Sequence, residues 1–244
     1  MLRKSTLLLA AVALLCLPAQ AQEIALDALL SNHFDALGGL DTIKSVQTTK
    51  ATGRMTLGPG METTFTRYSM RPDKVRLEFD FQGMTGIQAY DGETAWMFMP
   101  FAGQAGPEPM PAELASQMKQ ESDLDGPLVD YQAKGHQIEL MGTEDVEGAP
   151  CYKLQVTLNN GDVQYYYIDE EYYLLIKITG TTSMQGMEID FETSFSDYKE
   201  VGGQLIPHSI QLSGMQGPGS QGSIILELIE VNVEIDDSIF TMPS

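Results

Sequence analysis

The clearest alternation of hydrophobic and polar residues runs through the segment 70–101. Four apolar positions there alternate with charged or amide residues, the period of two expected of a strand with one buried face: Val75, Leu77, Phe79 and Phe81. The turn Arg71-Pro72-Asp73 precedes this strand, and the hairpin dipeptide Asp91-Gly92 ends the next one. The third strand carries Trp96 and Phe98 and is apolar on both sides, so we expect both of its faces to be covered.

The same reading along the whole chain predicts one helix, five strands, a helical insertion and seven further strands. This order favours a mainly β (α+β) fold, a large antiparallel sheet with helices on one side. The predicted helices cover 23–37 and 112–120, with shorter turns at 40–43 and 124–131. The predicted strands cover 45–57, 61–70, 74–82, 86–90, 94–99, 136–141, 150–158, 162–168, 173–182, 188–199, 204–213 and 222–233.

The inward-facing positions of these strands form a continuous apolar surface, as in 152–158 and in 189–195, where Phe191 and Phe195 alternate with acidic residues. Methionines are abundant, and four of them follow glycine at predicted turns: Met61, Met84, Met187 and Met215. The first two share one end of the sheet and so do the last two, which predicts a methionine-tipped end in at least the second half of the sheet. Methionine is flexible and polarizable, and it suits surfaces that accept ligands of variable shape. Plain core filling is the alternative for any single methionine.

The first 21 residues are typical of a secretory signal peptide. Arg3 and Lys4 precede an apolar run over 7–17, and Ala19-Gln20-Ala21 is a small-x-small cleavage site. The run is too short for a membrane span. We therefore expect an exported, periplasmic protein, cleaved after Ala21, with residues 22–244 forming a single monomeric domain without stable membrane insertion.

Charge narrows the choice of partner. Without Arg3 and Lys4 the chain has a formal charge of about −22, which disfavours nucleic acid and anionic lipid headgroups. The remaining arginines all fall in 54–76, and they indicate either one basic patch or ordinary solvated strand edges: Arg54, Arg67, Arg71 and Arg76.

Motifs for catalysis or cofactor binding are absent from the sequence, which has no HExxH, CxxC, P-loop or dinucleotide fingerprint. We expect no cofactor, no metal and no catalytic residue. His208 is interpreted as a core histidine bonded to a tyrosine, with a catalytic base as the alternative. Cys151 is interpreted as a packed thiol rather than a reactive one.

One stretch resembles a known family. Arg71-Pro72, the alternating strand, the run 91–96 ending in Trp96, and Pro100-Phe101 look like the periplasmic outer-membrane lipoprotein carriers of the LolA type, and 236–243 resembles their closing segment. The resemblance implies an unclosed antiparallel β-barrel of about 10–12 strands. Helices within about 23–43 and 111–131 would cap its concave face over an acyl-chain cavity. It also implies that Arg71 lies near the cavity mouth and helps to latch the lid, and that Trp96 is the matching aromatic residue.

Three hypotheses follow. The first is a non-catalytic carrier of acylated molecules, lipoproteins first, that serves a membrane-bound donor and acceptor. The second is a sensor on the same fold that binds lipid or lipoprotein and signals to a membrane partner, and the third is a secreted hydrolase that uses His208. For the first we expect one mouth residue and a set of cavity-lining residues: Arg71, Leu77, Phe79, Phe81, Met84, Trp96, Phe98, Leu114, Met118 and Phe191.

Overall fold

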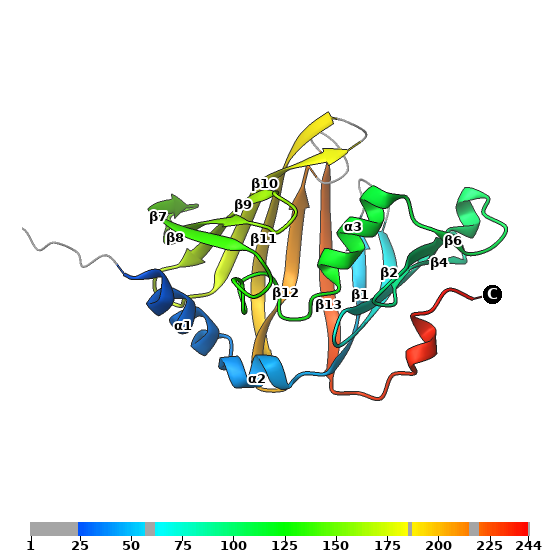
Figure 1. Cartoon of the computed structure of the whole chain (residues 1–244), viewed down its shortest axis with the longest axis horizontal. Helices are drawn as coiled ribbons and strands as arrows, with labels where there is room; N and C mark the ends of the chain where they lie inside the picture. The colour runs from blue at the N-terminus through cyan, green and yellow to red at the C-terminus, as the bar shows by residue number, and fades with distance from the viewer. Residues whose placement is uncertain (1–23, 57–61, 185–186, 215–219, 244) are drawn as a thin grey trace, which may run out of the picture.

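The computed structural model describes residues 24–56, 62–184, 187–214 and 220–243. Within these residues, thirteen strands form one antiparallel sheet that does not close into a barrel (Figure 1). Every neighbouring pair is antiparallel, and a long-range pairing of β1 with β13 joins the two halves of the chain. The strand order is β6-β5-β4-β3-β2-β1-β13-β12-β11-β10-β9-β8-β7.

The strands follow the predicted alternation closely. Their bounds are β1 Thr48–Thr56, β2 Glu62–Met70, β3 Lys74–Phe81, β4 Met84–Tyr90, β5 Ala95–Phe98, β6 Glu108–Pro109, β7 Gln137–Val146, β8 Ala149–Thr157, β9 Val163–Asp169, β10 Leu175–Met184, β11 Met187–Val201, β12 Gln204–Ser213 and β13 Gln221–Val231. The two-residue β6 was not predicted, because a strand this short carries no alternation. The hairpin prediction at Asp91-Gly92 is confirmed, since Gly92 takes positive φ in a tight turn, and Gly161 does the same between β8 and β9.

The helices lie on the concave face of the sheet, as predicted (Figure 1). They are α1 Leu26–Ala36, α2 Leu40–Ser45 and α3 Ala112–Glu121, with short 3-10 turns η1 Pro100–Ala102 and η2 Asp237–Ile239. We call α1, α2, α3 and the turn segment 122–136 the lid. Gly38 ends α1 with φ +110°, and a Cβ there would lie 2.0 Å from the carbonyl oxygen of Gly203. Only glycine permits this close approach between the lid and the β11–β12 turn.

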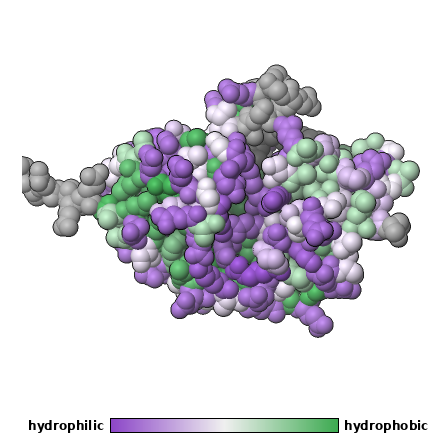
Figure 2. Space-filling view, in the orientation of Figure 1, coloured by the Kyte–Doolittle hydropathy of each residue, from purple (hydrophilic) through white to green (hydrophobic). Residues whose placement is uncertain are grey.

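Two hydrophobic clusters hold the lid to the two ends of the sheet. The first joins α1 and the segment after α3 to β7–β9: Leu29, Leu30, Leu128, Ile138, Leu154, Val156, Leu158, Tyr166 and Ile168. The second joins α3 to β3–β5: Val75, Tyr90, Ala95, Met110 and Met118. Figure 2 shows the matching surface, with apolar residues gathered near α1 at one end and near α3 and β6 at the other, and a hydrophilic band between them.

The predicted methionine-tipped end is largely outside the described residues. Gly60-Met61, Gly186 and Met215 are not described, and neither is the side chain of Met187. The signal peptide also lies outside them. Met84 is described, and it is 38% exposed at the β3–β4 hairpin.

Candidate functional site

The middle of the concave face can be traced through the strand register. Ile178 of β10 packs against the cluster beneath α1, and it pairs with Thr193 of β11. Because side chains alternate along a strand, Phe195 lies on this face too, and it pairs with Ile210, which in turn pairs with Ile224. We call this set the central strip: Phe191, Phe195, Ile210, Leu212, Ile224 and Leu226.

The central strip is apolar but not buried. All six of its side chains are half-buried, and among the described side chains of β11–β13 only Ile189 and His208 are buried. By contrast, Leu29 and Leu154 under α1 have no exposure at all. The lid therefore covers the two ends of the concave face and leaves its middle partly accessible. Such a face can accept an apolar ligand without unpacking a core.

An aromatic group continues this surface toward the other end of the sheet. The rings of Phe79 and Phe81 lie 5.8 and 5.2 Å from the ring of Phe101, centroid to centroid. Gly86 makes room for them, since a Cβ at that position would lie 2.8 Å from both Phe79 and Phe101. Gly180 does the same for Phe191, whose ring atoms would lie 2.8 Å from an added Cβ. Both glycines are explained by close packing of aromatic rings, not by turn geometry.

Arg71 joins two lid segments, the end of α2 and the turn segment after α3, at the edge of this face. Its guanidinium donates two hydrogen bonds to Asp125, at 2.7 and 2.5 Å. It also donates to the carbonyl oxygens of Val46, at 2.5 Å, and Ile43, at 3.2 Å, at the end of α2. A planar guanidinium suits this bidentate geometry. Arg71 therefore joins lid elements that are far apart in sequence.

Arg71 and Asp125 each stabilise the charged form of the other. The hydrogen bonds from Arg71 hold the pKa of Asp125 below its usual range, and Asp125 raises the pKa of Arg71. Only 22% of the Arg71 side chain and 11% of the Asp125 side chain is exposed, so water screens the pair weakly. A second arginine, Arg67, donates to the backbone oxygen of Glu121 at 2.7 Å and secures the end of α3.

We expect Asp125→Asn to lower the free energy of unfolding by about 2 kcal/mol at pH 7, because a charged hydrogen-bond pair is lost. The pKa of Asp125 is depressed in the folded state, so its stabilisation is present above the unfolded pKa of about 3.9 and fades as the pH falls further. Thermal unfolding from pH 7 to pH 3 should therefore show the difference between wild type and variant shrinking below about pH 4.

The matched control for this prediction is Asp130→Asn, which breaks an exposed ion pair with Lys44 at 2.6 Å. Those side chains are 51% and 41% exposed, so we expect a loss below about 1 kcal/mol. Equal losses in the two variants, or a difference for Asp125→Asn that persists unchanged in acid, would contradict the role given to the Arg71–Asp125 pair.

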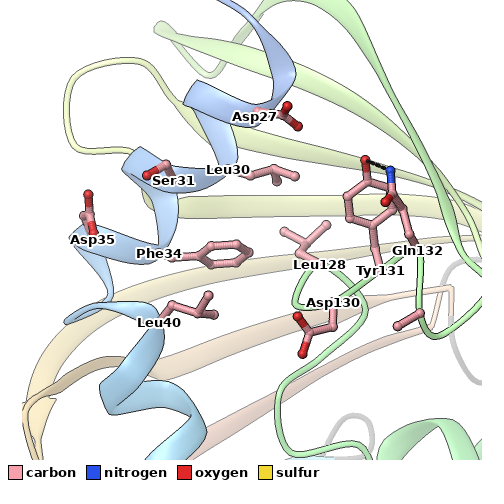
Figure 3. A pocket seen from close by; sticks show the side chains of 11 residues that line it. Asp27, Leu30, Ser31, Phe34, Asp35, Leu40, Leu128, Asp130, Tyr131 and Gln132 are labelled. Atoms are coloured by element: carbon pink, nitrogen blue, oxygen red, sulfur yellow. Dashed lines mark hydrogen bonds between the residues drawn. The ribbon is translucent and has the colours of Figure 1, made fainter.

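A pocket of about 450 Å3 opens within the lid, between α1, α2 and the turn segment after α3. Figure 3 shows Phe34 and Leu128 facing each other across it, with Leu30 and Leu40 on the helical side. Leu30 and Leu128 belong to the cluster that also contacts Ile178, so the pocket floor is continuous with the apolar face of the sheet. The volume falls within the range of about 300–1,000 Å3 typical of small-molecule sites.

Trp96 corrects one prediction. It does not share the face of Leu77 and Phe79 but lies on the opposite face of β5, where it is 1% exposed. Its indole nitrogen donates to the carbonyl oxygen of Phe240 at 2.6 Å, and the Arg76 guanidinium lies 5.6 Å from its ring centroid. Trp96 therefore anchors the carboxyl-terminal segment to the outside of the sheet, and it does not line the concave face.

The other predicted lining residues lie in three places: the concave face, the opposite face and α3. Leu77, Phe79, Phe81 and Phe191 share the concave face, and Met84 pairs with Phe81 at the hairpin. Phe98 follows Trp96 on the opposite face. On α3, Met118 is buried in the cluster with Val75, and Leu114 is 40% exposed to solvent. Met118 is thus part of a hydrophobic core and lines no open surface.

The arginines do not form one basic patch. Arg67 and Arg71 hold the lid, whereas Arg54 and Arg76 bond to carboxylates on the opposite face. Strand alternation explains the split, because Arg54 and Arg76 occupy positions of the other parity. The Asp125 and Glu121 partners could not be paired with these arginines from sequence spacing.

The candidate reactive residues are packed. His208 is 5% exposed, and its Nδ1 lies 2.9 Å from the carbonyl oxygen of Ile206. Cys151 is buried, and burial raises the pKa of its thiol to about 11, so it stays protonated at neutral pH. In the part of the chain that is described, no group of three or more His, Cys, Asp or Glu residues could hold a metal ion. No described helix is long and apolar enough to cross a membrane.

Solved structures define the class of this fold. A LolA superfamily protein from Nitrosomonas europaea aligns with a TM-score of 0.59 and 12% identity over 87% of this chain and 96% of its own. A domain assigned to outer membrane lipoprotein sorting, from Vibrio parahaemolyticus, gives 0.59 and 12% over 86% and 95%. A DUF1329 family protein from Desulfovibrio piger gives 0.59 and 16% over 88% and 96%. The chain thus has the LolA-type fold.

A family model described as an uncharacterized protein matches residues 82–244, about two thirds of the sequence. The chain belongs to that family. No curated protein sequence matches the chain.

Proposed function

We propose that this protein is a non-catalytic carrier that binds an acylated molecule, a lipoprotein or another lipid, and holds its acyl chain against the central strip. The observation that carries the proposal is the half-buried apolar middle of the concave face, between two lid-covered ends. The LolA-type fold supports it, because one structure of this fold belongs to a domain assigned to outer membrane lipoprotein sorting.

Magnitudes explain why such a face would be used. Each buried methylene contributes about 0.8 kcal/mol, so a long acyl chain gains on the order of 10 kcal/mol on leaving water. A dry void large enough for that chain would cost a large part of a domain's stability when empty. A half-covered strip with a movable lid avoids both the exposure of the acyl chain to water and the cost of an empty dry void. In this proposal the Arg71–Asp125 pair holds the lid, and binding or release requires that pair to open.

The signal peptide over 1–21 would direct the chain to the periplasm, where residues 22–244 act as a single monomeric domain. A membrane-bound donor would load the acyl chain and a membrane-bound acceptor would receive it. No cofactor is needed, because transfer between these partners changes no covalent bond.

Native mass spectrometry of protein recovered from the periplasm without detergent tests this proposal. We expect a fraction of the protein to carry an adduct whose fragments include fatty acyl groups. Protein that is uniformly free of adducts, and that also takes up no acyl chain when mixed with acylated peptide, would overturn the proposal.

A further inference from the structure

Almost all lysines and arginines in the described residues form ion pairs with carboxylates. Of the twelve lysines and arginines in the described residues, eleven lie within 4.0 Å of a carboxylate oxygen, and within that same part of the chain only Lys119 has no such partner. Carboxylates are in large excess, since the formal net charge is −20. A phosphate or other anionic headgroup would therefore find almost no free cation, and it would meet a repulsive field.

In the lid pocket, carboxylates lie next to an apolar floor. Figure 3 shows Asp27 on α1 beyond Leu30 at one end of the pocket and Asp130 on the turn segment below Leu128 at the other end, while Asp35 points away from the pocket. Asp130 is partnered by Lys44 at 2.6 Å. Asp27 has no ion-pair partner among the described residues. The pocket thus combines an apolar floor with a carboxylate, that of Asp27, which no described basic residue neutralises.

We infer that the lid pocket selects amphiphiles that carry a positive charge next to the acyl chain, such as an acylated peptide whose first residues are basic, over anionic lipids. The inference rests on the proposed function, since it names the class of acylated molecule that the carrier takes. The head-group end of the acyl chain would lie on Leu30, Phe34 and Leu128, and the rest of the chain would follow the continuous apolar face to the central strip. A cationic group would lie beside Asp27 at one end of the pocket or beside Asp130 at the other, where each contact is partly solvated and sensitive to salt.

Three peptides that differ only in charge test this inference: dodecanoyl-Gly-Lys-Lys-amide, dodecanoyl-Gly-Ser-Ser-amide and dodecanoyl-Gly-Glu-Glu-amide. Titration calorimetry with the full mature protein should give dissociation constants for each. At low ionic strength we expect the lysine peptide to bind at least about tenfold more tightly than the glutamate peptide. The ratio should shrink toward one at about 1 M salt, where the Debye length is about 3 Å.

The double variant Asp27→Asn/Asp130→Asn locates the effect. It removes the two carboxylates and leaves Lys44 without its partner, so the preference for the lysine peptide should vanish or reverse. Asn fits the backbone at position 130, where φ is +51°. The matched control Glu93→Gln/Glu139→Gln removes two exposed carboxylates outside the pocket and should keep the preference. If the double variant fails to fold, Asp27→Asn alone should still reduce the preference severalfold.

The outcomes separate the inference from the proposed function. Equal affinity for the lysine and glutamate peptides at low salt overturns the inference, even if the serine peptide binds and supports the carrier role. A preference that survives in the Asp27→Asn/Asp130→Asn variant also overturns it, because the selectivity then arises elsewhere. Binding of the lysine peptide alone supports the inference and counts against a general acyl carrier. Failure of all three peptides to bind overturns both.

Discussion

A single carboxylate in the middle of the central strip should abolish acyl-chain binding. We expect Phe195→Glu to weaken binding of dodecanoyl-Gly-Ser-Ser-amide at least about 100-fold, because a bound chain would cover the carboxylate and desolvate it at a cost of several kcal/mol. In the free protein the side chain at this position is only half-buried, so the same carboxylate can remain hydrated and the fold should survive. Titration calorimetry and native mass spectrometry both report the loss.

Two controls sharpen this result. Phe195→Leu keeps the face apolar and should retain binding within about threefold, since volume-conserving apolar changes are tolerated. Leu228→Glu places the same charge on β13 at a side chain that is 53% exposed and pairs with Thr52 of β1, away from the strip, and it should leave binding unchanged. Normal binding by Phe195→Glu with a native unfolding curve would contradict the proposed location of the acyl chain.

Truncation of Trp96 should be the most destabilising substitution. We expect Trp96→Ala to lower the free energy of unfolding by about 4 kcal/mol, because it leaves a large cavity and removes the donor to the Phe240 carbonyl oxygen. Released from this anchor, the carboxyl-terminal segment should also become sensitive to proteolysis. Urea unfolding followed by circular dichroism measures the first effect, and limited proteolysis measures the second.

Trp96→Phe separates packing from ligand binding. It keeps most of the buried ring and should cost about 1–2 kcal/mol, and both Trp96 variants should bind the acyl peptide normally at temperatures where they remain folded. A Trp96→Ala protein with unchanged stability but no acyl binding would instead place Trp96 in the ligand site, as the sequence had suggested.

Strand alternation was enough to predict most of the fold. The period of two in 74–82 and 188–199 predicts strands and which side chains share a face, and the strand register puts Leu77 and Phe79 on one face of β3 and Phe191 and Phe195 on one face of β11. Asp91-Gly92 predicts a hairpin because its turn needs positive φ, which Gly92 has. Resemblance, not periodicity, singled out Arg71.

The features that could not be predicted from the sequence depend on contacts between segments that are distant along the chain. Asp125 lies 54 residues from Arg71, and nothing in its local sequence distinguishes it from the other acidic residues of so acidic a chain. The lid pocket needs Phe34 and Leu128 to meet across two segments whose approach only the folded chain defines. These features are products of tertiary packing.

Trp96 shows why the face of a short strand is hard to predict. The strand β5 has only four residues and is apolar on both sides, so alternation could not tell which side met the cavity. The decisive partner was Phe240, which is fully buried and whose segment crosses the outer face of the sheet. A fully apolar strand indicated that both faces were covered, but it could not say by what.

Tryptophan fluorescence with a brominated acyl chain tests the central claim most directly, since the protein has one tryptophan and bromine quenches only at contact. The native Trp96, on the outer face of β5, should keep its fluorescence when bromopalmitoyl-Gly-Ser-Ser-amide binds. A tryptophan in the central strip, introduced as Phe195→Trp in a Trp96→Phe background, should be strongly quenched by the same peptide. Quenching of native Trp96, with none at position 195, would contradict the account.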